Sequence, residues 1–336
     1  MSYPTSPEAR EQFVATTYID LTRHSSRFGG KMEITFPNGE NMAFEDSKDL
    51  TPAGRTKAKD FAASAYPVEV TLVHPRGGDE ARHGQTGEDL MKGSDRIGKS
   101  REQSSEGTPA PIFSSSGRVK GARRGKEIDY ETAGAMADLK PALKMINTEL
   151  SRLVQNLSPE DQEKFKTDSE FRAELREKAQ IVGLKEAMKL EGLIKKLAEN
   201  EAYELMHVLE LSRRGVRAGE AKAIPMVGSG LFAESLFKYA LVVEDLKTGE
   251  KKVGFDDIEE IGGFTKQATA FRIKASRDTR LGDSRNLEEL KKDTEFSYEF
   301  TDPDRQKLFA GKKVYLDWDK VMQLAEAARQ RFEGGN

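Results

Sequence analysis

The segment Arg23-His24-Ser25-Ser26-Arg27 places a nucleophile between two permanent cations. It follows a short apolar and β-branched run, residues 16–22, that predicts a buried strand. Arginine is always charged and forms paired hydrogen bonds to phosphate oxygens. A neutral imidazole can attack phosphorus when a backbone carbonyl holds its other nitrogen and so fixes the tautomer. These residue types favour a phosphate site, although a surface loop that carries one His and two Arg explains them equally well.

Strand and helix signals alternate along the first ninety residues. Thr51 is a good helix N-cap and Pro52 suits the first helical position, so we expect a helix from there to about residue 65. Residues 68–73 predict a second strand, and a helical run begins near Glu80. This alternation predicts a parallel sheet with crossover helices. In such a sheet, ligands bind at the carboxyl ends of the strands, where the Arg-His segment stands.

The later sequence continues this alternation. Residues 221–227 have strand character, Gly228-Ser229-Gly230 is typical of a tight turn, and residues 231–243 predict a helix. Three short strands and a closing helix are then expected near residues 271–275, 296–300 and 313–316 and from Trp318 onward.

The opening motif resembles that of the histidine phosphatase superfamily, the phosphoglycerate mutase-like and acid phosphatase-like enzymes. Members share an Arg-His pair after the first strand, with a further Arg shortly afterwards. Arg23, His24 and Arg27 match this motif, and Ser25 stands where the family usually has Gly. The resemblance implies that His24 forms a phosphohistidine while the arginines neutralise the phosphoryl oxygens.

Two further segments follow in the family's order. The stretch Leu50 to Gly54 is similar to its "Leu-Thr, Gly, then helix" element. The pair His74-Pro75, followed by Arg82, resembles the segment whose Arg enters the phosphate pocket. The resemblance therefore adds Arg82 to the site. It implies an α/β fold, phosphoglycerate mutase-like, with a mostly parallel sheet flanked by helices.

One departure from the family concerns its second pocket histidine, which follows a later strand. The matching element, residues 223–236, contains no His, and Gly228 or Ser229 occupies the place, next to Gly230. Losing one such donor to the transition state costs about a hundred- to a thousand-fold in rate. The chain is thus an atypical member, either a weakened phosphatase or a pseudophosphatase. His74 or His83 filling the gap is a further hypothesis.

The nucleophile and the general acid both have alternatives. Arg82-His83-Gly84 spells the opening motif better than residues 23–27 do, but it lies far from the end of the preceding strand and after two glycines. His83 is kept as the second candidate nucleophile. The candidate general acids are Asp79, Glu80 and Glu234, although a solvated carboxylate or a helix cap is the simpler interpretation of each.

A length of 336 residues favours about two domains, or one with an insertion. We expect residues 1–126 to form the first part of the phosphatase-like core, with a flexible basic loop at 93–126. Residues 127–215 are predicted to be a long helical insertion, and residues 216–336 the remainder of the core with a C-terminal extension. His207, on an apolar helical face of the insertion, is interpreted as structural.

The loop at 93–126 carries the densest basic cluster, made of Arg118, Lys120, Arg123, Arg124 and Lys126. A solvated loop is the simplest interpretation, and a lid for a polyanion is the functional one. The 54 basic and 57 acidic residues give a net charge of −3, so no global field draws nucleic acid. Nucleic-acid binding through this cluster therefore ranks last among the function classes.

Composition excludes other classes. The chain has no Cys, which removes disulfides, thiolate metal sites and cysteine catalysis. No apolar run approaches the roughly 18 residues of a membrane helix, and the start lacks a signal pattern, so we expect a cytoplasmic protein without a membrane partner.

The sequence therefore predicts a phosphomonoester hydrolase that acts through a phosphohistidine on His24. Arg23, Arg27 and Arg82 are its expected phosphate ligands. The expected substrate-binding residues are Ser25, Gly228, Ser229 and Gly230. No metal or cofactor is implied, because the arginines supply the positive charge. The substrate is a phosphorylated small molecule or a phosphoprotein. The alternative is an impaired pseudophosphatase that binds a phospholigand or acts as a scaffold, with the helical insertion as a protein-partner surface.

Overall fold

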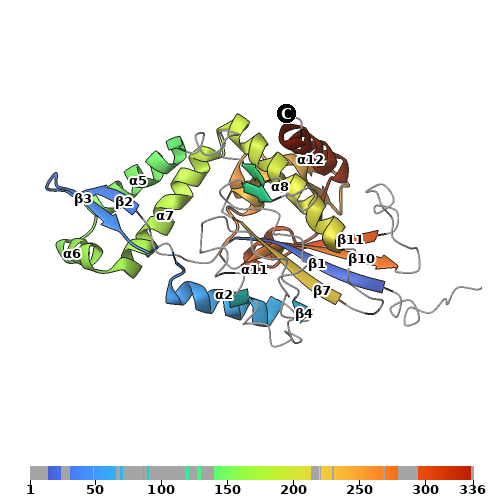
Figure 1. The fold of residues 1–336 in the computed structure, drawn as a ribbon, viewed down its shortest axis with the longest axis horizontal. Coiled ribbons are helices and arrows are strands. Elements are labelled where there is room, and N and C mark those ends of the chain that lie inside the picture. Colours follow the sequence, from blue (N-terminus) through green and yellow to red (C-terminus); the bar gives the residue numbers. More distant parts are fainter. Residues whose placement is uncertain are drawn as a thin grey trace, which may run out of the picture.

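The structure is a computed structural model, and it describes residues 14–23, 31–47, 49–65, 69–70, 86, 89–90, 118–120, 127–129, 140–212, 219, 221–228, 231–267, 269–278 and 294–333. The fold is mixed α/β, with helices around a central sheet (Figure 1).

The central sheet has five described strands in the order β11-β10-β1-β7-β4. The strands β1 (Val14–Arg23), β7 (Ala221–Gly228) and β4 (Glu69–Val70) run parallel. The strand β10 (Ala270–Asp278) pairs antiparallel with β1 and with β11 (Thr294–Phe300). The apolar and β-branched runs therefore form strands where the sequence predicts them.

The prediction of a mostly parallel sheet holds in part, because four of the five described strands run in one direction but the sheet is mixed. The strand β10 runs opposite to the other four, so its pairings with β1 and β11 are antiparallel. Only the pairings of β7 with β1 and β4 are parallel. Antiparallel neighbours need no crossover helix between them, unlike parallel ones. The alternation of parallel strands and crossover helices predicted from the first ninety residues therefore does not continue into the C-terminal strands.

One face of the sheet carries the main hydrophobic core. Helices α8 (Glu191–Ser212), α9 (Phe232–Ala240) and α12 (Trp318–Glu333) cover this face (Figure 1). Side chains alternate along a strand, so Ile19 and Leu21 of β1 point into this core. By the same alternation, Arg23 falls on the face that α8 and α9 cover.

Helix α2 (Pro52–Ala65) covers the opposite face (Figure 1). Its Ala58 and Ala62 pack with Ala223 and Val227 of β7. The predicted cap is confirmed, since the amide of Gly54 donates to Thr51 Oγ1 at 3.0 Å.

The predicted helical region contains α5 (Lys140–Gln155), α6 (Pro159–Thr167), α7 (Ser169–Ala187) and α8. Ser158 and Asp168 cap α6 and α7 by accepting backbone amides. Long helices with polar outer faces are therefore present as the charge pattern predicts.

A hairpin that the sequence analysis did not predict lies against these helices. It consists of β2 (Lys31–Thr35) and β3 (Asn41–Glu45), and it lies with α5, α6 and α7 at one end of the molecule (Figure 1). A second core joins them, with Ile34 and Phe165 both fully buried. Arg172 of α7 forms two hydrogen bonds to Asp46, at 2.6 and 2.8 Å.

The helix predicted over residues 231–243 is shorter, because α9 ends at Ala240. The next residues form β8 (Leu241–Asp245), which pairs with β9 (Lys251–Val253) and β12 (Lys312–Leu316). This ladder and the β-branched pair Val242-Val243 overrule the helical periodicity. A 3₁₀ turn η2 (Ile258–Ile261) and a short helix α11 (Pro303–Leu308) complete this part.

Short strands also lie where a flexible loop was predicted. The strand β5 (Arg118–Lys120) pairs antiparallel with β6 (Glu127–Asp129), which begins the predicted helical insertion. Residues 118–120 of the 93–126 segment therefore form a strand. The rest of that segment and most of the helical run predicted near Glu80 lie outside the described residues.

Candidate functional site

The last residues of β1 and β7 lie opposite each other. In the parallel register of these strands, Arg23 is the partner of Gly228. Both strands therefore end at the same edge of the sheet, and the chain leaves them toward His24 on one side and Ser229 on the other. This is the carboxyl edge at which open α/β sheets bind their ligands. Two segments far apart in the sequence thus start side by side.

Of the predicted site residues, the structure describes Arg23 and Gly228. The others lie outside the described residues, namely His24, Ser25, Arg27, Arg82, Ser229 and Gly230. The alternatives His74, His83, Asp79 and Glu80 also lie outside them. His207 belongs to α8, and its side chain lies outside what the structure describes.

Arg23 is buried, with 6% of its surface exposed. Its Nη1 donates to the carbonyl of Thr265 at 3.4 Å, and its Nη2 donates to Oε1 of Gln180 at 3.3 Å. Among the described residues, its Nε–H has no hydrogen-bond partner. Burial lowers the pKa of the Arg23 guanidinium, while the carboxylates of Glu234 and Glu177 oppose that shift. One N–H of the guanidinium, the buried Nε–H, is therefore without a partner among the described residues.

Glu234 corrects one sequence interpretation. It lies in the first turn of α9 and is fully buried, so it is not a solvated carboxylate. Its Oε1 accepts the amide of Thr265 at 2.5 Å rather than capping its own helix. Its Oε2 has no hydrogen-bond partner among the described residues. A buried carboxylate needs cations nearby, and the guanidinium groups of Arg23 and Arg305 interact with it electrostatically.

Arg305 of α11 is a further buried arginine near Glu234, with 2% of its surface exposed. Its Nη1 donates to Thr265 Oγ1 at 3.3 Å and its Nη2 donates to the carbonyl of Gly263 at 2.5 Å. Its guanidinium carbon lies 4.9 Å from the centre of the Phe300 ring. Burial lowers the pKa of Arg305, and Glu234 and then Asp302 oppose this. Arg23, Glu234 and Arg305 thus form one group of buried charges, called the charge cluster below.

Sequence reasoning missed Gln180, Thr265 and Arg305. No local pattern marks them, because they come from α7, a loop and α11, and they meet only in the folded chain. The Gly262-Gly263 pair just before Thr265 was a usable turn signal. It indicates a loop but not its partner.

The packing around position 228 leaves room for a side chain and does not by itself require glycine there. A Cβ atom at this position would lie 3.5 Å from Cβ of Phe232, an ordinary contact. Leu231, the N-cap of α9, makes no side-chain hydrogen bond to the helix amides. Such uncapped helix amides favour an anion. Helix α9 thus begins at Phe232, shortly after the register partner of Arg23, with no side-chain cap from Leu231.

A second buried ion pair lies on the opposite face of β1. Arg272 of β10 donates to both carboxylate oxygens of Asp20, each at 2.8 Å. Asp20 is fully buried, and the guanidinium of Arg272 lies 5.3 Å from the centre of the Tyr18 ring. Because both partners satisfy each other, this pair stabilises the sheet and offers little to a ligand.

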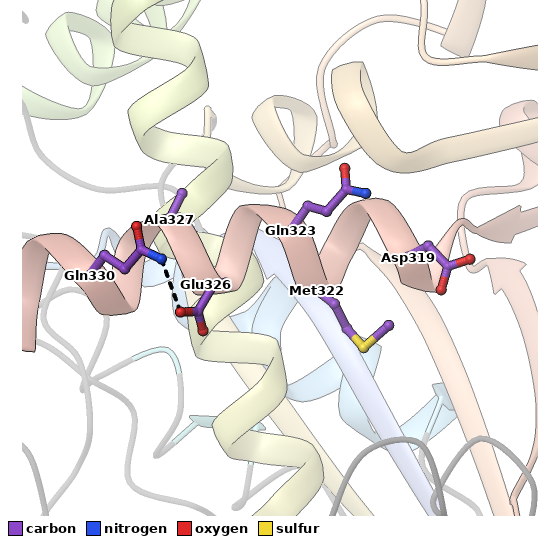
Figure 2. Close-up of a pocket in the computed structure, with 6 residues that line it drawn as sticks. All are labelled: Asp319, Met322, Gln323, Glu326, Ala327 and Gln330. Atoms are coloured by element: carbon purple, nitrogen blue, oxygen red, sulfur yellow. Dashed lines mark hydrogen bonds between the residues drawn. The ribbon is translucent and has the colours of Figure 1, made fainter.

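An open depression of about 520 Å³ lies along α12 (Figure 2). All its lining residues belong to that helix: Asp319, Met322, Gln323, Glu326, Ala327 and Gln330. Glu326 accepts a hydrogen bond from Gln330, as Figure 2 shows, and also from Arg329. Its ionisable lining groups are acids, which disfavour phosphate, so this depression is a poor candidate for the predicted phosphate site.

The described residues contain no group of three or more His, Cys, Asp or Glu side chains arranged to hold a metal ion. Within the same part of the chain, no helix has both the length and the apolar character needed to cross a bilayer.

No family model and no curated protein matches this chain. Among solved structures, the chain is similar to a phytase from Hafnia alvei, in complex with myo-inositol hexakis sulphate. The sequences are 10% identical, the similarity covers 94% of this chain and 97% of that one, and the TM-score is 0.42. At this TM-score the function must be argued from the chain's own residues.

Proposed function

We propose that this protein hydrolyses phosphomonoesters through a phosphohistidine formed on His24. The observation that carries the proposal is the register of Arg23 with Gly228 at the carboxyl edge of two parallel strands. It starts the Arg-His segment and the Gly-Ser-Gly segment side by side, as the resemblance to histidine phosphatases requires. Arg23, with an Nε–H that has no partner among the described residues, adds a charged donor at that edge.

The proposed reaction has two displacements. First, an imidazole nitrogen of His24 forms a bond to phosphorus while the bond to the ester oxygen breaks and the leaving alcohol takes a proton. A water oxygen then forms a bond to phosphorus, the N–P bond breaks, and orthophosphate leaves. Arg23, Arg27 and Arg82 neutralise the phosphoryl oxygens in both steps. Ser25, Gly228, Ser229 and Gly230 line the substrate, and the arginine charges replace a metal ion.

A second candidate function is phospholigand binding without turnover. Two observations favour it: the segment that follows β7 lacks the family's second histidine, and Arg23 already donates to Thr265 and Gln180. The ligand is a phosphorylated small molecule or a phosphoprotein in either case. The helical region 127–215 would then act as a surface for a protein partner.

The test is hydrolysis of p-nitrophenyl phosphate from acidic to neutral pH by the wild type and His→Ala variants at positions 24, 83 and 207. We expect His24→Ala to abolish turnover, while His83→Ala and the matched control His207→Ala retain it. Turnover that survives in His24→Ala and is lost in His83→Ala would reassign the nucleophile. An inactive wild type that is stabilised against heat by inorganic phosphate would support the binding function instead.

A further inference from the structure

Thr265 contacts three buried charged side chains through three different groups. Its backbone amide donates to Glu234 Oε1 at 2.5 Å, and its carbonyl accepts from Arg23 Nη1 at 3.4 Å. Its hydroxyl Oγ1 accepts from Arg305 Nη1 at 3.3 Å. Thr265 is itself 2% exposed. One residue therefore links β1, α9 and α11, which lie far apart in the sequence.

The loop that carries Thr265 is held on both sides. Gly262 and Gly263, with φ of 79° and 80°, adopt the left-handed conformation that favours glycine. A Cβ atom on Gly262 would lie 3.2 Å from Cγ of Arg305, so Arg305 packs closely on this turn. Arg305 also donates to the carbonyl of Gly263. The position of the Thr265 carbonyl is therefore set by Arg305 as well as by the loop itself.

The charges of the cluster depend on one another. Arg23 and Arg305 are buried cations, and Glu234 is the carboxylate that interacts with both. Side chains that contact a charged ligand-binding group set the orientation of that group. A misplacement of about 1 Å can lower a reaction rate about a hundredfold. Besides its interaction with Glu234, Arg305 donates a hydrogen bond to the hydroxyl of Thr265, the residue whose carbonyl accepts from Arg23.

We infer that Thr265 is a positioning residue for Arg23 and that, through its hydroxyl, Arg305 of the C-terminal segment sets how tightly the site holds phosphate. The inference rests on the proposed function only in taking Arg23 as a phosphate ligand. The resemblance offers no counterpart for the C-terminal segment. By this inference, the segment influences phosphate binding through Arg305.

The test is the Kd of inorganic phosphate, measured by isothermal titration calorimetry, which needs no turnover. Thr265→Val removes the hydroxyl and keeps the backbone, and we expect it to raise the Kd by about tenfold or more. Thr265→Ser keeps the hydroxyl and should restore the Kd to within about twofold of the wild type. Thr269→Val is the matched control, because the Thr269 hydroxyl donates to the carbonyl of Lys266 in the same loop.

A second variant, Arg305→Lys, leaves Thr265 intact and shortens the side chain that donates to it. It should also weaken phosphate binding, so the inference stays testable when Thr265→Val does not fold. Phosphate binding by Thr265→Val or by Arg305→Lys that equals the wild type would overturn the positioning role, as would a Thr265→Ser protein impaired as much as Thr265→Val. Phosphate that fails to bind the wild type would instead overturn the proposed function.

Discussion

Arg23 and Gly228 are register partners at the ends of two parallel strands. The pairing means that the Arg-His segment and the Gly-Ser-Gly segment leave the sheet at one edge, although about two hundred residues separate them in the chain. Parallel neighbours bring together the carboxyl ends of strands, and this is the part of an α/β fold that most often binds ligands. This register therefore supports a phosphate site at that edge independently of the sequence motif.

Glu234→Gln should lower the free energy of unfolding by about 3 kcal/mol, because Arg23 and Arg305 would lose the carboxylate charge that both share. Urea denaturation of the wild type and the variant measures this. Glu326→Gln is the matched control, since Glu326 is partly exposed and pairs with Arg329 on the surface of α12, so little change is expected. A Glu234→Gln protein as stable as the control would contradict the charge cluster.

The Asp20–Arg272 pair should show strong coupling in a double-mutant cycle. Each of Asp20→Asn and Arg272→Met leaves its partner's charge buried and unpaired, at a cost of about 3 kcal/mol. The double variant should cost less than the sum of the two, with a coupling energy of about 2 kcal/mol. Additive effects in urea denaturation would show that the two hydrogen bonds do not form in solution.

Thr51→Ala should destabilise the protein by about 1 kcal/mol, because the amide of Gly54 loses the side-chain oxygen that caps α2. Thr51→Ser keeps that oxygen and should restore most of the stability. Thr56→Ala is the control on the same helix, where the exposed hydroxyl donates to the carbonyl of Pro52. Thermal unfolding of the three variants checks the order, and equal effects at positions 51 and 56 would count against the cap.

Tyr298 should make stability fall at high pH. Burial raises the pKa of its hydroxyl, which accepts a hydrogen bond from Trp318 Nε1 at 2.6 Å. Above about pH 10 the unfolded chain releases this proton and the folded chain keeps it, so stability decreases as pH rises. Tyr298→Phe lacks this proton. The difference in the free energy of unfolding between the wild type and Tyr298→Phe, measured by urea denaturation, should therefore shrink between about pH 9 and pH 11. A difference that stays constant over this range would contradict the raised pKa of Tyr298.

Much of the fold was readable from local signals. The β-branched run at residues 16–22 forms β1, and Thr51 with Pro52 starts α2 where capping chemistry predicts. The hairpin β2–β3 was missed although Met32 and Ile34 alternate with polar residues before an Asn38-Gly39 turn. The reversed direction of β10 carries no local signal, because it depends on which strand the chain returns to.

The charge cluster could not be predicted in the same way. Glu234 stands in the first turn of a helix, where an acid usually faces solvent or caps the helix amides. Only the fold shows that Thr265 and two arginines surround it. Burial of polar residues is a tertiary property, so side-chain type and spacing underdetermine it. The roles of His24, Arg27 and Arg82 remain predictions from the sequence.

The most direct test of the central proposal is to trap the phosphoenzyme. The wild type is mixed with a radiolabelled phosphomonoester and quenched in alkaline denaturant, since a phosphohistidine survives base and is lost in acid. We predict a label that is stable in base, labile in acid and confined to the peptide that contains His24, and that is absent from His24→Ala. Hydrolysis that continues in His24→Ala, or a label found on another residue, would contradict the account.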